Sequence, residues 1–119
     1  MRRVLLVEDE TLVALLLEDM LDDLGFEVVE VASQLETALD LVERVAFDVA
    51  VLDVNLGGYI RSFPVADRLR LRGIPFIFAT GHERSGLAIA YPGTPVVQKP
   101  FRRDELSEAL QRALAKNRS

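Results

Sequence analysis

Short apolar runs that end abruptly at charged residues constrain the fold of this chain more than any other feature. Each run has the length and composition of a buried strand. The charged residues that directly follow three of these runs are Glu8, Asp9, Asp53 and Lys99. In an open parallel sheet, the carboxyl ends of neighbouring strands converge on one crevice. The pattern therefore predicts that three carboxylates and one ammonium group meet in a small space.

Strand and helix patterns alternate five times along the sequence. Strands are predicted at residues 4–7, 28–31, 49–52, 76–79 and 96–98. Alternating units of this length favour a parallel sheet that is covered by helices on both faces. Glu27 and Glu30 are typical of an edge strand, which places the second strand at the border of the sheet. The predicted fold class is α/β, a doubly wound five-stranded parallel sheet of order 2-1-3-4-5.

The helical segments carry apolar residues at helical spacing. The first helix is expected to follow the acidic pair and to bury one stripe, formed by Leu12, Leu15, Leu16 and Met20. Ser33, followed three residues later by Glu36, predicts a capping box at the start of the second helix. A third helix is expected from about residue 63 to just before Gly73, and residues 84–90 predict a short fourth helix. The fifth helix is expected to bury Leu106, Ala109, Leu110, Ala113 and Leu114.

Length and composition exclude several classes of protein. A chain of 119 residues predicts one domain, residues 1–119. The absence of cysteine excludes disulfides and thiolate metal sites. The longest apolar run, residues 12–17, is too short to span a bilayer, and the net charge of −5 without a basic stripe argues against nucleic-acid binding. We therefore expect a cytoplasmic protein that binds neither membrane nor nucleic acid.

Asp53 is the candidate nucleophile of the predicted crevice. A carboxylate is ionised at neutral pH and can attack phosphorus without a general base. The alternative is that Asp53 only caps the turn after its strand, but Glu8, Asp9 and Lys99 beside it favour the chemical role. Arranged around Asp53, these groups are what the transfer of a phosphoryl group to a carboxylate requires.

Glu8 and Asp9 are the candidate metal ligands. Carboxylates that lie close together repel one another, and a divalent cation with oxygen ligands resolves the conflict. Mg²⁺ suits a site with few carboxylates that retains water. Favourable charge at the start of the first helix explains the same residues, and both explanations can hold together. Glu10, the next residue, is assigned only to the helix start.

Thr80 and Lys99 are the candidate partners of a transferred phosphoryl group. Thr80 ends the fourth predicted strand, and Gly81 after it leaves room for the backbone to approach a phosphate. The hydroxyl of Thr80 would donate to one phosphoryl oxygen, and Lys99 would balance another as a compact point charge. An ordinary threonine at a strand end is the alternative interpretation of Thr80.

These residues resemble a known family. The resemblance is to the receiver domains of bacterial two-component response regulators, and it rests on Glu8, Asp9, Asp53, Thr80 and Lys99, with Pro100-Phe101 after the lysine. It implies the flavodoxin-like receiver fold and a phosphoprotein that signals, rather than an enzyme acting on other substrates. Asp53 would accept a phosphoryl group from a histidine kinase or a histidine phosphotransfer protein, with Mg²⁺ as cofactor. The domain would catalyse only this transfer and its own slow dephosphorylation.

The resemblance also implies finer features of the site. The backbone carbonyl of Asn55 would complete the protein ligands of Mg²⁺, beside Glu8, Asp9 and Asp53. The bond between Lys99 and Pro100 would be cis. Side chains at the positions of Asn55 and His82 would border the line of an attacking water and tune the lifetime of the phosphoryl group.

Two departures from the family pattern concern the output of the signal. Val96 stands where receivers commonly carry a Tyr or Phe that rotates on activation. The sequence Phe-Ala-Thr-Gly at residues 78–81 resembles an alphaproteobacterial subset of receivers, although Glu83 replaces the tyrosine usual in that subset. We therefore expect the segment 81–93 to carry the conformational change.

Three functions stay open on the sequence alone. The leading one is a stand-alone receiver whose output is contact with a downstream protein that the sequence does not name. The second is a receiver-like scaffold or phosphate sink, in which phosphorylation does not alter binding. The third is a small flavodoxin-like enzyme, but the glycine-rich nucleotide motifs are absent, and an aspartyl phosphatase of the haloacid dehalogenase type would need a second Asp where Asn55 stands.

Overall fold

A computed structural model, which describes residues 1–81 and 84–116, shows parallel strands alternating with helices. The strands are β1 (Arg2–Val7), β2 (Phe26–Ala32), β3 (Val49–Leu52), β4 (Phe76–Thr80) and β5 (Val96–Gln98). The helices are α1 (Thr11–Asp23), α2 (Leu35–Arg44), α3 (Phe63–Leu71), α4 (Arg84–Ala90) and α5 (Arg103–Lys116). The strands pair in the order β2-β1-β3-β4-β5, and each pairing is parallel. The predicted fold class and strand order are confirmed.

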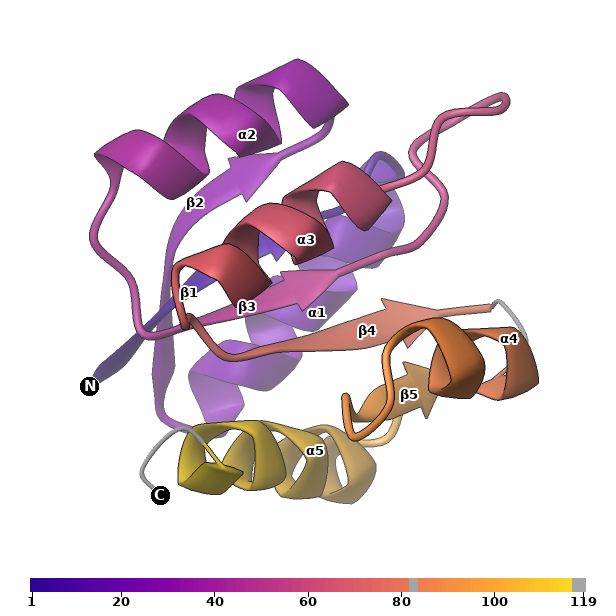
Figure 1. Cartoon of the computed structure of the whole chain (residues 1–119). Coiled ribbons are helices and arrows are strands. Elements are labelled where there is room, and N and C mark those ends of the chain that lie inside the picture. Colours follow the sequence, from indigo (N-terminus) through magenta and orange to yellow (C-terminus); the bar gives the residue numbers. More distant parts are fainter. Residues whose placement is uncertain (82–83, 117–119) are drawn as a thin grey trace.

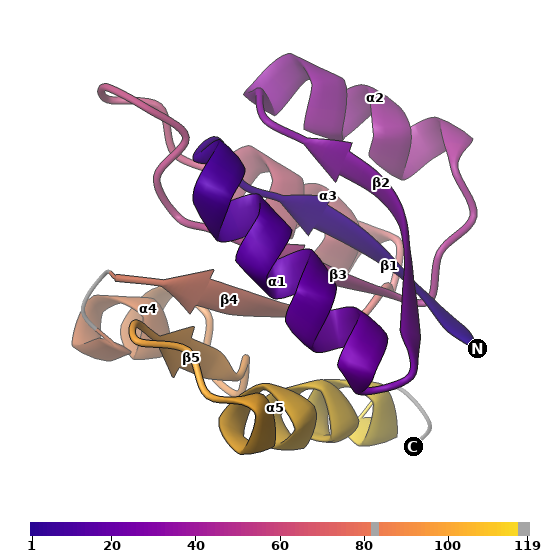
Figure 2. The same cartoon turned by 180° about the vertical axis from the view of Figure 1, so that it is seen from behind.

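The sheet is a middle layer between two groups of helices. Helices α2, α3 and α4 cover one face, while α1 and α5 cover the other (Figures 1 and 2). Along β3, Ala50 and Leu52 pack toward the first group, and Val49 and Val51 pack toward the second. This alternation follows from the two-residue period of a strand. It explains why β3, which is buried on both faces, is apolar at every position.

Helix α1 does not bury the stripe that its sequence predicts. Its buried residues are Ala14, Leu17, Met20 and Leu21, so only Met20 of the predicted stripe lies in the core. Leu12, Leu15 and Leu16 are exposed, with 81% of the Leu12 surface open to solvent. The segment 12–17 is apolar all round the helix, so more than one set of positions fits the helical period. The prediction chose the wrong one of these sets.

The start of α2 also differs from the prediction. The helix begins at Leu35 with Gln34 as its N-cap, and no side chain caps it. Ser33 therefore lies one residue too early to form the expected capping box. Ala38 and Val42 are buried, and the packing of this apolar face against the sheet stabilises the helix more than a cap does.

Tyr91 joins the end of α4 to α3 through an aromatic cluster. Its ring stacks on Phe63, with centroids 5.5 Å apart, and meets Phe78 edge-on at 5.3 Å. Its hydroxyl donates a hydrogen bond of 2.9 Å to Asp67 Oδ1, and the Arg70 guanidinium lies 4.9 Å from its ring centre. Burial, together with the hydrogen bond to Asp67, raises the pKa of Tyr91 to about 12.

The two tyrosines of the chain allow a matched test of this cluster. Tyr91→Phe removes the hydroxyl that donates to Asp67, and we expect the free energy of unfolding to fall by about 1 kcal/mol. Tyr59→Phe is the control, because Tyr59 is 98% exposed and should leave stability unchanged. Urea unfolding measures both. Equal midpoints for the two variants would contradict the role of the hydroxyl.

Candidate functional site

Glu8 and Asp53 lie at adjacent strand ends because the hydrogen-bond ladder of the sheet continues one residue past β1 and β3. The N–H of Asp53 donates to the carbonyl of Val7 at 2.9 Å, and the N–H of Glu8 donates to the carbonyl of Ala32 at 3.0 Å. The arrowheads of the central strands end on one side of the sheet (Figure 1). Both carboxyl groups are therefore held at that edge, and Asp53 is only 5% exposed.

Thr80 and Lys99 reach the same edge from β4 and β5. Thr80 is the last residue of β4 and is fully buried. The N–H of Lys99 donates to the carbonyl of Thr80 at 3.2 Å, which fixes where the lysine side chain starts. The bond between Lys99 and Pro100 is cis, as the family resemblance implied. The sheet thus brings residues that are far apart in the sequence to one rim.

The carboxyl group of Glu8 is buried with only half of its hydrogen-bonding capacity used. Oε2 accepts the N–H of Glu10 at 3.2 Å, whereas Oε1 is buried without a hydrogen-bond partner. Burial raises the pKa of Glu8 from its ordinary value of 4.5 to about 8, against the lowering effect of the Glu10 N–H. The neighbouring Asp53 and Asp9 contribute to the same rise. A cation or a proton is therefore needed at Glu8.

The donor set around Glu8 fits Mg²⁺. One carboxylate oxygen each of Glu8, Asp9 and Glu10 lies within 4.8 Å of the others, and Asp53 adjoins Glu8. These hard oxygen donors, one of them without a partner, are the ligands that Mg²⁺ prefers. The group of three carboxylates within this distance contains Glu10 and not the expected Asp53. The sequence assigned Glu10 only to the start of the helix.

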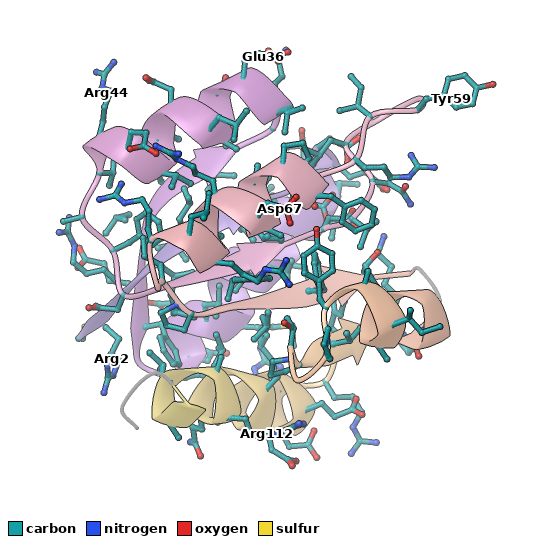
Figure 3. All side chains as sticks on the ribbon, viewed as in Figure 1. Arg2, Glu36, Arg44, Tyr59, Asp67 and Arg112 are labelled. Carbon is teal, nitrogen blue, oxygen red and sulfur yellow. The ribbon has the colours of Figure 1, made fainter. Side chains whose placement is uncertain are left out.

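The loop between β3 and α3 is a short hairpin beside the acidic residues. Asn55 pairs with Arg61, and the flanking hydrogen bonds use the Val54 carbonyl and the Leu56 N–H. The hairpin therefore does not use the Asn55 carbonyl, the expected metal ligand. A Cβ on Gly57 would lie 3.5 Å from Asp9 Oδ2, so the loop backbone closes over Asp9. Tyr59 marks the exposed tip of the hairpin (Figure 3).

Lys99 forms an ion pair that the sequence does not predict. Its Nζ lies 3.8 Å from Glu10 Oε1, and within residues 1–81 and 84–116 it has no ion pair with Asp53. Glu10 is the N-cap residue of α1, but its side chain makes no capping hydrogen bond. A glutamate at a position where small polar residues are preferred was the available signal that this side chain serves another group.

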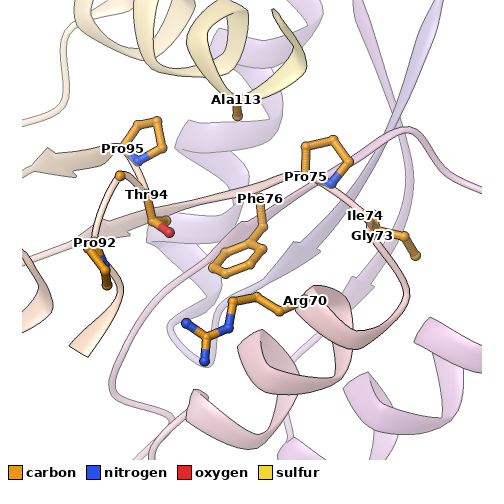
Figure 4. Close-up of a pocket in the computed structure, with 10 residues that line it drawn as sticks. Arg70, Gly73, Ile74, Pro75, Phe76, Pro92, Thr94, Pro95 and Ala113 are labelled. Carbon is orange, nitrogen blue, oxygen red and sulfur yellow. The ribbon is translucent and has the colours of Figure 1, made fainter. Parts of the chain in front are cut away.

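A pocket of about 220 Å³ opens at the opposite, amino-terminal edge of β4 and β5 (Figure 4). Arg70, Phe76 and Pro95 are among its lining residues, and none of the predicted site residues lines it. His82, whose position the family resemblance associates with the lifetime of the phosphoryl group, lies outside the described residues. In the described part of the chain, no helix combines the length and apolarity needed to cross a bilayer.

Comparison with known proteins identifies the family of this chain. A family model of the response regulator receiver domain matches residues 4–111. The chain belongs to this family. The receiver domain is 36% identical over 120 residues to the positive alginate biosynthesis regulatory protein of Pseudomonas aeruginosa, covering 97% of this chain and 48% of that protein. It spans about half the length of the curated relatives it matches.

Solved structures extend the comparison to the whole fold. The solution structure of SdrG from Sphingomonas melonis Fr1 is 42% identical, with a TM-score of 0.84 over 96% of this chain and 97% of that one. The BeF3-activated conformation of SdrG, from Pseudomonas melonis Fr1, is 43% identical, with a TM-score of 0.79 over 94% of this chain and 95% of that one. The receiver domain is therefore similar to SdrG along almost its whole length.

The raised pKa of Glu8 predicts how stability depends on pH without metal. The folded state holds this proton more tightly than the unfolded state, so metal-free stability should fall as pH rises from about 5 to about 9. Glu8→Gln removes the titrating carboxyl group, so the stability of this variant should depend less on pH. Thermal unfolding in EDTA across that range measures the slope.

Glu27→Gln is the control for this experiment, because Glu27 is exposed on the edge strand β2. It should keep the pH slope of the parent protein. The same slope in Glu8→Gln as in the parent would show that Glu8 does not hold the proton.

Proposed function

We propose that this receiver domain accepts a phosphoryl group on Asp53. The observation that carries the proposal is the meeting of a buried carboxyl pair, Glu8 and Asp53, with Thr80 and Lys99 at the ends of adjacent strands. Asp53 directly follows β3, and its N–H bond to the Val7 carbonyl fixes its backbone beside β1. These properties suit a nucleophile that must stay in line with an incoming donor.

The donor is a phosphohistidine of a histidine kinase or a histidine phosphotransfer protein. An oxygen of Asp53 attacks phosphorus, and the new P–O bond forms as the P–N bond breaks. The electron pair of that bond stays on the imidazole nitrogen, which takes a proton from water. Thr80 donates its hydroxyl to one phosphoryl oxygen, and the ammonium of Lys99 balances another.

Glu8, Asp9, Asp53 and the Asn55 carbonyl are the groups that would hold Mg²⁺. Bound there, Mg²⁺ supplies positive charge to the phosphoryl oxygens. The partnerless Oε1 of Glu8 and the close approach of Asp9 to the hairpin support this assignment. Glu8 must lose its proton before it serves as a ligand, so the site binds metal better as pH rises.

The output of the domain is contact with another protein in the cytoplasm. The similarity to SdrG, which has a BeF3-activated conformation, supports a change of shape on phosphorylation. We place that change in the segment 81–93, of which residues 82–83 lie outside the described part of the chain, because Val96 supplies no aromatic ring to rotate beside Thr80. Movement of Thr80 toward the phosphoryl group would reorder this segment.

One observation favours the phosphate sink as a second candidate. Leu87 and Tyr91 are buried, so two side chains anchor α4 and its C-terminal end in the core. An anchored segment resists reordering, because its motion exposes apolar surface. If it does not move, phosphorylation stays confined to the site.

Substitution of Asp53 tests the phosphoacceptor directly. With Mg²⁺ and acetyl phosphate, the parent protein should gain the mass of one phosphoryl group, and Asp53→Asn should gain none. Asp22→Asn, at an exposed aspartate of α1, is the control and should be labelled like the parent. Intact-mass measurement decides, and a labelled Asp53→Asn protein would refute the assignment.

The choice between transmitter and sink depends on which amide signals move. With Mg²⁺ and beryllofluoride, a transmitter should show amide shift changes in α4 and at Tyr91, in addition to those around Asp53. Tyr91→Phe, which loosens the anchor, should enlarge the changes in α4. Changes confined to the loops around Glu8, Asp53 and Lys99 would leave only the sink.

A further inference from the structure

Lys99 and Glu10 form an ion pair across the rim of the site, and hydrogen bonds fix the backbone of each residue. Lys99 is held by its N–H bond to the Thr80 carbonyl, and its Cδ lies 3.7 Å from where a Cβ on Gly81 would be. The stem of the lysine therefore runs over Gly81, and its ammonium points toward the start of α1, where Glu10 Oε1 is 3.8 Å away.

Glu10 is anchored in a way that leaves its carboxylate available. Its N–H donates to Glu8 Oε2, and its carbonyl accepts the N–H of Ala14 at 2.9 Å. The side chain takes no part in capping the helix. The backbone of Glu10 thus braces the candidate metal ligand Glu8, while its side chain serves Lys99.

Among the described residues, Lys99 supplies the one ammonium group at this rim. Two anionic groups can pair with it, namely the Glu10 carboxylate and a phosphoryl group on Asp53. Without a phosphoryl group, the ammonium pairs with Glu10 and not with Asp53. A phosphoryl group on Asp53 adds negative charge, and its stabilisation under the proposed function requires Lys99. Lys99 must then loosen its pair with Glu10 to reach that charge.

We propose that Glu10 is a positioning residue, which holds Lys99 at the rim and competes with the phosphoryl group for its ammonium. The inference rests on the proposed function of Asp53 and Lys99. The pair is largely exposed, with 37% of the Lys99 side chain and 63% of the Glu10 side chain open to solvent. An exposed pair is weak, so Glu10 tunes the affinity of the site for a phosphoryl group and does not block it.

The test is the dissociation constant of beryllofluoride at saturating Mg²⁺, measured by amide NMR titration. Glu10→Gln keeps the backbone N–H bond to Glu8 and removes the charge that holds Lys99. We expect it to bind beryllofluoride about two- to five-fold more tightly than the parent. In a Lys99→Ala background, the same substitution should change the affinity by less than this, because no ammonium remains to be released.

The background variant separates competition from simple repulsion. If Glu10 only repels the anion through space, Glu10→Gln tightens binding equally with and without Lys99, and the proposal fails. Glu10→Asp gives the same distinction, because it keeps the charge but shortens its reach. It should bind more tightly than the parent if the pair matters, and like the parent if only charge matters.

The lysine side chains give a second readout. The sequence contains two lysines, Lys99 and Lys116, so protein labelled with ¹³C-lysine gives two side-chain signals, which Lys116→Arg assigns. Glu10→Gln should move the Lys99 signal in the free protein. With beryllofluoride bound, the signals of parent and variant should approach each other. An unmoved Lys99 signal in the free variant would overturn the proposal.

Failure of this inference is distinguishable from failure of the proposed function. If the parent binds no beryllofluoride with Mg²⁺, both fall together. If the parent binds it and Glu10→Gln binds equally or more weakly, only the competition is refuted. Weaker binding of Mg²⁺ by the variant would show instead that Glu10 is a metal ligand.

Discussion

The burial of the Glu8 carboxyl group against Asp53 is the interaction on which the rest of the site depends. Two acidic groups in a poorly solvated place repel, and this arrangement persists only because the sheet fixes both backbones. The raised pKa of Glu8 and its partnerless Oε1 are two consequences of the same constraint. The fold thus holds negative charge at one edge of the sheet that a positive charge must balance. A proton can balance this charge in the metal-free protein, and under the proposed function a divalent cation would balance it instead.

The groups that can balance the negative charge of the site lie at different depths. The Glu10 N–H already bonds to Glu8, which lowers the cost of its burial. Lys99 lies farther out, in an exposed and therefore weak ion pair with Glu10. The buried carboxyl groups of Glu8 and Asp53 therefore lie deepest, and the exposed ion pair of Lys99 with Glu10 lies at the rim. This order suits the proposed function, in which the site would hold a metal ion and respond to the charge of a phosphoryl group.

The strands and the candidate site were predictable from the sequence because both depend on short-range pattern. Each apolar run marked a strand, and the polar residues after it had to lie at the strand end. The buried face of α1 was not predictable in this way, because Leu12 and Leu17 are equally apolar and only the position of the sheet distinguishes them. The pairing of Lys99 with Glu10 was missed for a similar reason. It joins opposite ends of the chain and depends on which way two long side chains turn.

The aromatic cluster around Tyr91 limits how a signal can leave the site. Phe78, two residues before Thr80, packs edge-on against Tyr91, whose hydroxyl is bonded to Asp67 on α3. Val96 stands at the position where the family commonly has an aromatic ring. In this structure the ring of Tyr91, at the end of α4, packs in the core on the α2, α3 and α4 face of the sheet. Any displacement of α4 must therefore either carry Tyr91 with it and break the bond to α3, or pivot about Tyr91. In both cases the contacts of Tyr91 with α3 restrict how α4 can move, because this buried tyrosine belongs to the packing of both helices.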